Sequence, residues 1–123
     1  MNTLRNKVTL IGRIGAKPEI QKLNGGYVIT RISLATNERY KTKDGEWKDN
    51  TQWHNIVLWG KAAESFVKVT DKGSEVMVEG KLVNKQYETK SGEKRYSTEI
   101  DVADFLLIKK IEKEATEAVA AIK

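Results

Sequence analysis

Apolar and polar residues alternate along most of the chain, and this alternation predicts five β-strands. The strands are expected over residues 4–14, 27–37, 51–60, 74–88 and 95–108. Residues 61–70 instead carry apolar side chains at helical spacing and predict one short helix between the third and fourth strands. This element order is that of the OB-fold, a five-stranded Greek-key barrel, so we expect an all-β protein.

Polar segments separate the strands and predict the turns. Residues 38–50 and 88–94 are long enough to project from the barrel as β-hairpin arms. We expect a single domain over residues 1–108, with no internal repeat. Residues 109–123 change in character and predict a short amphipathic or frayed helical tail.

The central strand, residues 51–60, has two unlike faces. The face that includes His54 is otherwise apolar and is typical of a packed interior. The other face carries Trp53 and Trp59 with the amide of Asn55 between them. Indoles on a partly solvent-exposed surface are platforms on which nucleic-acid bases stack. We therefore interpret Trp53 and Trp59 as base-stacking residues. The alternative is that both tryptophans belong to the barrel core or to a subunit interface.

Basic residues are interleaved with aromatic rings in both arms, as expected where cations follow phosphates and rings stack on bases. The candidate stacking residues are Tyr40, Trp47, Trp53, Trp59 and Tyr87. The candidate phosphate contacts are Lys7, Arg31, Arg39, Lys41, Lys43, Lys48, Lys61, Lys81, Lys85 and Arg95. The alternatives are a charged hairpin whose rings cover the barrel end, and, for the strand lysines, an ordinary solvated face.

Composition adds three constraints. The net charge of +5 and the pI near 9.4 favour an anionic partner. The absence of cysteine excludes disulfides and cysteine-ligated zinc. The chain has neither an apolar run long enough to cross a bilayer nor a secretion signal, so we expect a soluble, cytoplasmic protein without a membrane partner.

A series of short motifs runs in order along residues 5–105. They are Asn6-Lys7-Val8, Pro18-Glu19, Asn24-Gly25-Gly26, Leu34-Ala35-Thr36, Thr51-x-Trp53-His54, Gly60-Lys61, Gly73-Ser74-x-Val76, Glu79-Gly80-x-Leu82, Ser91-Gly92 and Arg95-Tyr96-x-Thr98-Glu99. In this order and at these spacings the chain resembles the bacterial single-stranded DNA-binding protein (SSB) family. The resemblance implies sequence-independent binding and protection of single-stranded DNA in replication, repair and recombination, in association with the nucleoid.

The resemblance also assigns roles to residues. It implies base stacking at Tyr40, Trp53, Trp59 and Tyr87, whereas Trp47 matches no usual aromatic position of the family. Well-known members often have tryptophan at the two tyrosine positions and phenylalanine at the position of Trp59. His54 corresponds to a position of subunit contact, which implies a homotetramer, with a dimer as the alternative.

The end of the chain departs from the family pattern. Cellular members usually finish in a Gly/Pro/Gln-rich tail with an acidic tip that recruits replication and repair proteins. This chain finishes in Ala120-Ala121-Ile122-Lys123, so recruitment through such a tip is in doubt.

DNA binding has three alternatives. A single-stranded RNA-binding OB module and a non-catalytic assembly module both fit the same pattern. An enzyme such as a nuclease does not, because His54 has no evident nucleophile beside it and no carboxylate cluster suited to two metals is apparent. Glu99 and Asp101 share a strand face, where carboxylates are usually solvated. We therefore expect no catalysis, no metal and no cofactor.

Overall fold

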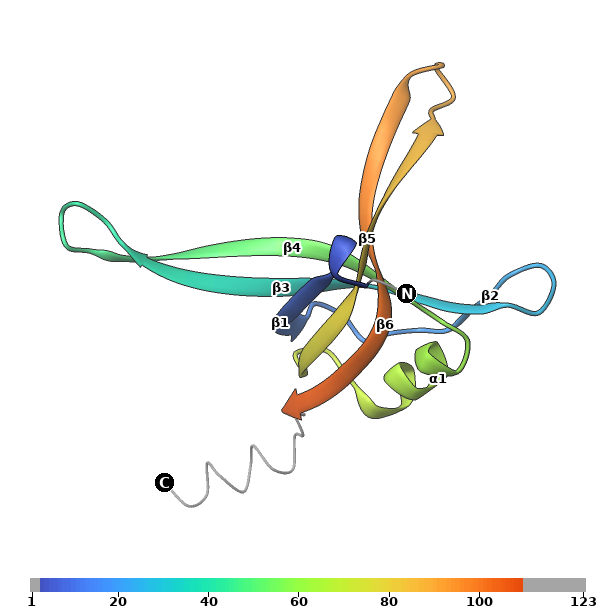
Figure 1. Cartoon of the computed structure of the whole chain (residues 1–123), viewed down its shortest axis with the longest axis horizontal. Coiled ribbons are helices and arrows are strands. Elements are labelled where there is room, and N and C mark those ends of the chain that lie inside the picture. The colour runs from blue at the N-terminus through green and yellow to red at the C-terminus, as the bar shows by residue number, and fades with distance from the viewer. Residues whose placement is uncertain (1–2, 110–123) are drawn as a thin grey trace.

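The computed structural model describes residues 3–109 of the chain, and its fold is mostly β (Figure 1). Its elements are a short 3-10 turn η1 (Thr3–Arg5), strands β1 (Val8–Ile14), β2 (Gln21–Lys22), β3 (Val28–Lys41) and β4 (Trp47–Trp59), helix α1 (Gly60–Val69), and strands β5 (Glu75–Glu88) and β6 (Lys94–Lys109). The predicted helical tail lies, beyond Lys109, outside the described residues.

Five of the strands close into a barrel. The order is β1-β5-β6-β4-β3, and β1 pairs again with β3 to complete the ring. All neighbours are antiparallel except β4 and β6, which run parallel. Helix α1 lies between the third and fourth barrel strands, as predicted, and β2 is a short additional strand on the edge of β3. The predicted OB-fold is confirmed.

The core fills the barrel and is closed at one end by α1. It is formed by Ile14, Ile32, Leu34, Ile56, Leu58, Ala63, Phe66, Val76, Val78, Ile100 and Val102. Phe66 of the helix meets Phe105 of β6 edge-on, with ring centroids 5.1 Å apart. Thr70 ends the helix by donating a hydrogen bond from Oγ1 to the Phe66 carbonyl at 2.6 Å. The helix is therefore fixed both by its apolar side and by its cap.

Two glycines allow the strands to approach closely where the barrel curves. A Cβ at Gly12 would lie 2.2 Å from the carbonyl oxygen of Ala35, and one at Gly80 would lie 2.1 Å from that of Asp101. The β5–β6 register shifts between Glu79 and Gly80. A larger residue at either glycine would have to push the backbone apart.

The first arm is a longer ladder than the sequence predicted, whereas the strands of the second arm end within one residue of the predicted bounds. The segment 38–50 was expected as a hairpin loop, but β3 and β4 remain paired out to Lys41 and Trp47 (Figure 1). The prediction of a loop over these residues is wrong. Both faces of this arm are exposed to water, so its strands carry no alternation of apolar and polar residues. The backbone ladder holds it, with cross-strand contacts such as the Thr51 hydroxyl donating to Asn37 Oδ1 at 2.6 Å.

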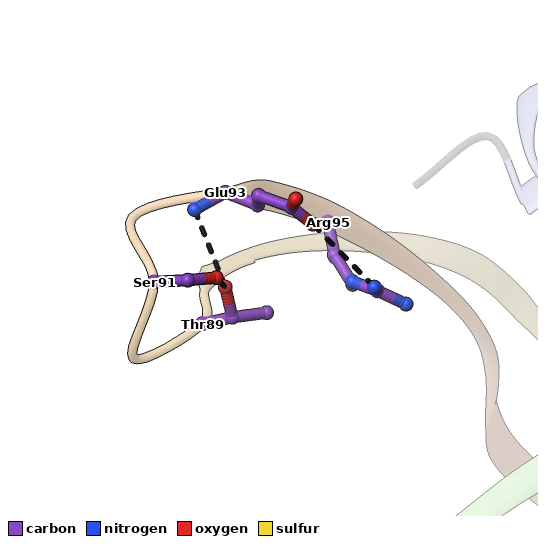
Figure 2. Close-up of polar contacts among 4 residues, drawn as sticks. All are labelled: Thr89, Ser91, Glu93 and Arg95. Atoms are coloured by element: carbon purple, nitrogen blue, oxygen red, sulfur yellow. Dashed lines mark hydrogen bonds and ion pairs between the residues drawn. The ribbon is translucent and has the colours of Figure 1, made fainter.

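The tips of the two arms share one five-residue turn sequence. Residues 42–46 and 89–93 both read Thr-Lys-x-Gly-Glu. In each, the glutamate N–H donates to the threonine hydroxyl at 3.2 Å, and the glycine has a positive φ near 85°. Figure 2 shows the second tip, where the hydroxyls of Thr89 and Ser91 also share a hydrogen bond of 2.9 Å. The lysine at the second position of each tip is therefore equivalent in the two arms.

Candidate nucleic-acid interface

The register of strands β3, β4, β5 and β6 brings their odd-numbered residues onto one continuous surface, which we call the outer face. Directly opposed residues point to the same side of a sheet, and β3–β4, β4–β6 and β5–β6 all pair odd with odd along this stretch. Ten of the candidate residues lie on it. They are Arg31, Arg39, Lys41, Trp47, Trp53, Trp59, Lys81, Lys85, Tyr87 and Arg95.

Trp53 and Trp59 are open on this face. Trp53 is 63% exposed and Trp59 is 41% exposed, so neither belongs to the barrel core of this chain. The Trp53 ring packs over Gly15, where a Cβ would lie 2.8 Å from the ring carbon Cζ3. Gly15 is in turn held to β3 by a hydrogen bond from its N–H to the Ser33 carbonyl at 2.9 Å. The indole therefore has a fixed edge and a free face.

The rings of the arms extend the same surface. Trp47 is exposed, and the Arg39 guanidinium carbon lies 5.7 Å from its ring centroid, a cation–π contact. Tyr87 is exposed on the second arm, opposite Arg95 in the register. Each arm thus offers an aromatic ring directly beside a cation.

Tyr40 does not lie on the outer face. It opposes Lys48 in the β3–β4 register, and both are even-numbered, so they occupy the reverse side of the first arm. The ring is exposed there. The candidate stacking residues are therefore not all on one surface.

His54 is on the same reverse side as Tyr40 and is half-buried. Its Nε2 is 2.9 Å from the hydroxyl of Thr36. Within residues 3–109 no three histidine, cysteine or carboxylate side chains gather closely enough to bind a metal ion. None of the helices in that range has the length and apolar character needed to span a membrane.

Four of the candidate cations are in ion pairs. The pairs are Lys7–Glu79 at 3.4 Å, Arg39–Asp49 at 3.4 Å, Lys85–Glu99 at 3.5 Å and Arg95–Glu93 at 3.5 Å (the last in Figure 2). The pairs of Lys7, Arg39 and Arg95 are exposed on both sides and contribute about 0–1 kcal/mol each, whereas the carboxylate paired with Lys85 is buried. No ion pair is found, within the described part of the chain, for Arg31, Lys41, Lys43, Lys48, Lys61 or Lys81.

The outer face is hollowed between the two tryptophans. A hollow of about 370 Å³ is lined by residues of β3, β4 and β6, among them Arg31, Asn55 and Glu99. A second, of about 540 Å³, lies where Trp59 meets Tyr27 and Lys61 of α1. Both openings leave free space on the surface beside these residues.

The structure adds residues that the pattern did not single out. Tyr27, beside Trp59, and Tyr96, on the second arm, are exposed rings, and Lys90 is the equivalent of Lys43 at the other arm tip. The repeated Thr-Lys-x-Gly-Glu pattern was the signal that could have identified Lys90. Glu99 was expected to be solvated, but it is buried, because β4 and β5 flank it on both sides.

Residues 5–108 match the family model described as the single-strand binding protein family. A Plasmodium falciparum SSB in complex with ssDNA is similar, with 34% identity and a TM-score of 0.76, over 85% of this chain and 95% of that one. A deletion mutant of the single-stranded DNA binding protein from Thermus aquaticus has 26% identity and a TM-score of 0.74, over 85% of this chain and 50% of that one.

Proposed function

Because the chain belongs to the single-strand binding protein family, we propose that it binds single-stranded DNA irrespective of base sequence and without catalysing a reaction. The observation that carries the proposal is the outer face, where Trp53, Trp59 and Tyr87 are open to solvent beside cations. The solved complex of the similar Plasmodium protein with ssDNA supports the same ligand.

Aromatic stacking supplies the sequence tolerance of this binding. Every base has a π-face, and stacking on one ring is worth about 1–3 kcal/mol. The rings of Trp53 and Trp59 are both carried by β4, so their separation is set by a rigid strand that pairs on both sides. Bases are therefore held without the loss of entropy that flexible loops would add.

Cations on the same face supply the affinity for phosphate. Arg31 lies in the central hollow and Lys61 lies beside Trp59, so positive charge accompanies both indoles. Each phosphate that a cation neutralises releases counterions, so affinity falls steeply as salt rises. Tyr40 and Lys48, on the reverse side of the first arm, contribute only to strands long enough to pass around it.

Titration with oligo(dT) at two salt concentrations tests the proposal. We expect tryptophan emission to be quenched as bases stack, with weaker binding at the higher salt. An absence of both quenching and complex formation at low salt would reject DNA binding. A competing oligo(U) that binds more tightly than oligo(dT) would instead indicate an RNA ligand, because only RNA offers 2′-hydroxyl groups.

We further propose that the protein assembles as a homotetramer, with a dimer as the alternative. Ile11, Met77 and Leu106 are neighbours across the paired strands β1, β5 and β6, and they form an apolar row that is exposed at Ile11 and Leu106. Apolar surface of this kind marks interfaces. His54 is proposed to contribute a subunit contact from the face opposite Trp53.

Light scattering of the wild type and of Ile11→Lys tests the assembly. The wild type is expected to have the mass of four copies, or of two, and the variant a smaller mass, because a charge would be buried in the contact. Tyr96→Lys, at an exposed ring outside the row, is the control and should leave the mass unchanged. A monomeric wild type would reject assembly, and an unaffected variant would reject this row as the contact.

The cellular role follows from the ligand. We propose that the protein coats and protects strands exposed during replication, repair and recombination, in the cytoplasm and in association with the nucleoid. A fold without cysteine needs no oxidising compartment, which supports this location.

A further inference from the structure

The turn that leads into β3 presents an exposed tyrosine. Leu23 donates its N–H to the Tyr27 carbonyl at 2.7 Å, and Gly26 donates its N–H to the Leu23 carbonyl at 3.2 Å. Gly25 and Gly26 have φ values of 88° and 84°, a conformation that glycine adopts readily. These features fix the backbone of Tyr27, while the residue remains 66% exposed.

The ring of Tyr27 is supported in the same way as the indole of Trp53. A Cβ at Gly25 would lie 3.3 Å from the Tyr27 ring carbon Cε2. A Cβ at Gly15 would likewise lie 2.8 Å from Cζ3 of Trp53. In both cases the ring lies against a glycine, and most of the residue stays open to solvent. A ring held in this way loses little conformational freedom when a base stacks on it.

Tyr27 and Trp59 line one hollow of about 540 Å³ at the start of α1. This volume lies within the range of ~300–1,000 Å³ that is usual for small-molecule sites. Lys61 and Glu64, one helical turn apart, supply one positive and one negative charge, and the other lining residues are glycine and valine. The opposite charges largely cancel, so the hollow offers a ligand ring faces rather than net charge.

The hollow continues the line of rings along β4. Trp47, Trp53 and Trp59 follow one another on this strand. Trp59 is paired with Ile29 of β3, and Tyr27 lies two residues before Ile29. Tyr27 is therefore just past the end of the paired strands, on the side of the molecule opposite the first arm (Figure 1). A DNA strand that passes Trp59 in this direction meets Tyr27 next.

Building on the proposed function, we propose that Tyr27 is a further base-stacking residue. A base that enters the hollow stacks on Tyr27, next along the strand to the base on Trp59. Every base has a π-face, so this position keeps the binding independent of sequence. The contribution of Tyr27 depends on the base rather than on phosphate, because the charges that border the hollow oppose each other.

Tyr27→Ala tests the residue in a length series of oligo(dT). The variant should bind about 5- to 150-fold more weakly than the wild type once the oligomer is long enough to extend past Trp59, and shorter oligomers should bind both equally. The salt dependence should be unchanged, since no phosphate contact is lost. Tyr27→Phe keeps the ring face and should bind like the wild type. Tyr96→Ala, which removes an exposed tyrosine from the reverse side of the second arm, is the matched control and should keep the affinity.

Removing a single base separates stacking from a change in the turn. The oligomer is the shortest one on which Tyr27→Ala weakens binding, and an abasic sugar replaces its terminal nucleoside at the 5′ end and then at the 3′ end. At one of the two ends, loss of the base should weaken the wild type about 5-fold or more and leave Tyr27→Ala unaffected. If alanine acted only by loosening the turn, loss of the base would weaken both proteins equally.

The outcomes distinguish the role of Tyr27 from the DNA binding on which it rests. If the wild type binds oligo(dT) but Tyr27→Ala binds as tightly at every length, or if loss of a terminal base weakens both proteins equally, the stacking role is overturned and DNA binding stands. If no oligomer binds the wild type, the proposed function fails, and the role of Tyr27 fails with it. If thermal unfolding shows that Tyr27→Ala is not folded, Tyr27→Leu decides in the same assays, because leucine covers Gly25 but has no ring.

Discussion

Replacing Trp53 with alanine separates DNA binding from stability, because the indole is 63% exposed in the free protein. Roughly a third of the residue is covered, mainly where the ring packs over Gly15. A large aromatic buries about 150–250 Å² when fully covered, so about 80 Å² is at stake here. At ~25 cal/mol per Å² the variant should lose at most about 2 kcal/mol of unfolding free energy.

The loss in DNA affinity should have a different size and cause. Removing one stacking ring costs about 1–3 kcal/mol, which is about a 5- to 150-fold weaker Kd for oligo(dT). The salt dependence should be unchanged, because no phosphate contact is removed. Fluorescence anisotropy of a labelled oligomer at several salt concentrations measures both quantities, and denaturant unfolding measures the stability.

Tyr96→Ala is the matched control for this experiment. It also removes an exposed ring from a strand, but Tyr96 is even-numbered and lies on the reverse side of the second arm. We expect less than about a twofold change with an oligomer that covers only the outer face. Equal effects of the two variants, or no loss of affinity in the folded Trp53→Ala protein, would refute the assignment of the outer face.

Three further predictions follow from the same geometry. Lys41→Gln should lower the slope of log K against log salt by about 0.7, whereas Lys72→Gln, in a turn away from the outer face, should leave the slope unchanged in the same titration. Tyr40→Ala should weaken long oligomers and spare short ones, since its ring is on the reverse side of the arm; equal losses at all lengths in a length series would contradict that placement. Gly80→Ala should lower the free energy of unfolding by about 3 kcal/mol or more, because the added Cβ would meet the Asp101 carbonyl. Gly26→Ala has free space around the Cβ and should lower it by only about 1–2 kcal/mol, because Gly26 has a positive φ. Similar losses in denaturant unfolding of the two variants would contradict the close approach at Gly80.

The barrel was predictable from sequence because its strands have one apolar face. The pattern over 74–88 predicted β5 to within one residue, and the helical spacing of Ala63 and Phe66 predicted α1 with the same accuracy. The first arm was not predictable in length, because its strands have polar residues on both faces and leave no period to detect. The Thr-Lys-x-Gly-Glu sequence at residues 42–46 and 89–93 marks where each arm turns.

The candidate site was predictable in its residue types more than in its arrangement. Alternation within β4 correctly placed Trp53 and Trp59 on one face and His54 on the other. It could not say that Tyr40 falls on the reverse of the arm, because the expected loop gave that residue no register. Nor could it show that Glu99 is covered, since this burial comes from the parallel pairing of β4 with β6, a contact between segments far apart in the chain.

The most direct test of the outer face is photocross-linking of a single-stranded oligomer that carries 5-iododeoxyuridine, followed by mapping of the linked peptides. Aromatic rings that stack on bases cross-link efficiently, so we expect the links at Trp53, Trp59 and Tyr87. Links confined to the apolar row of Ile11 and Leu106, with none on the outer face, would contradict the account.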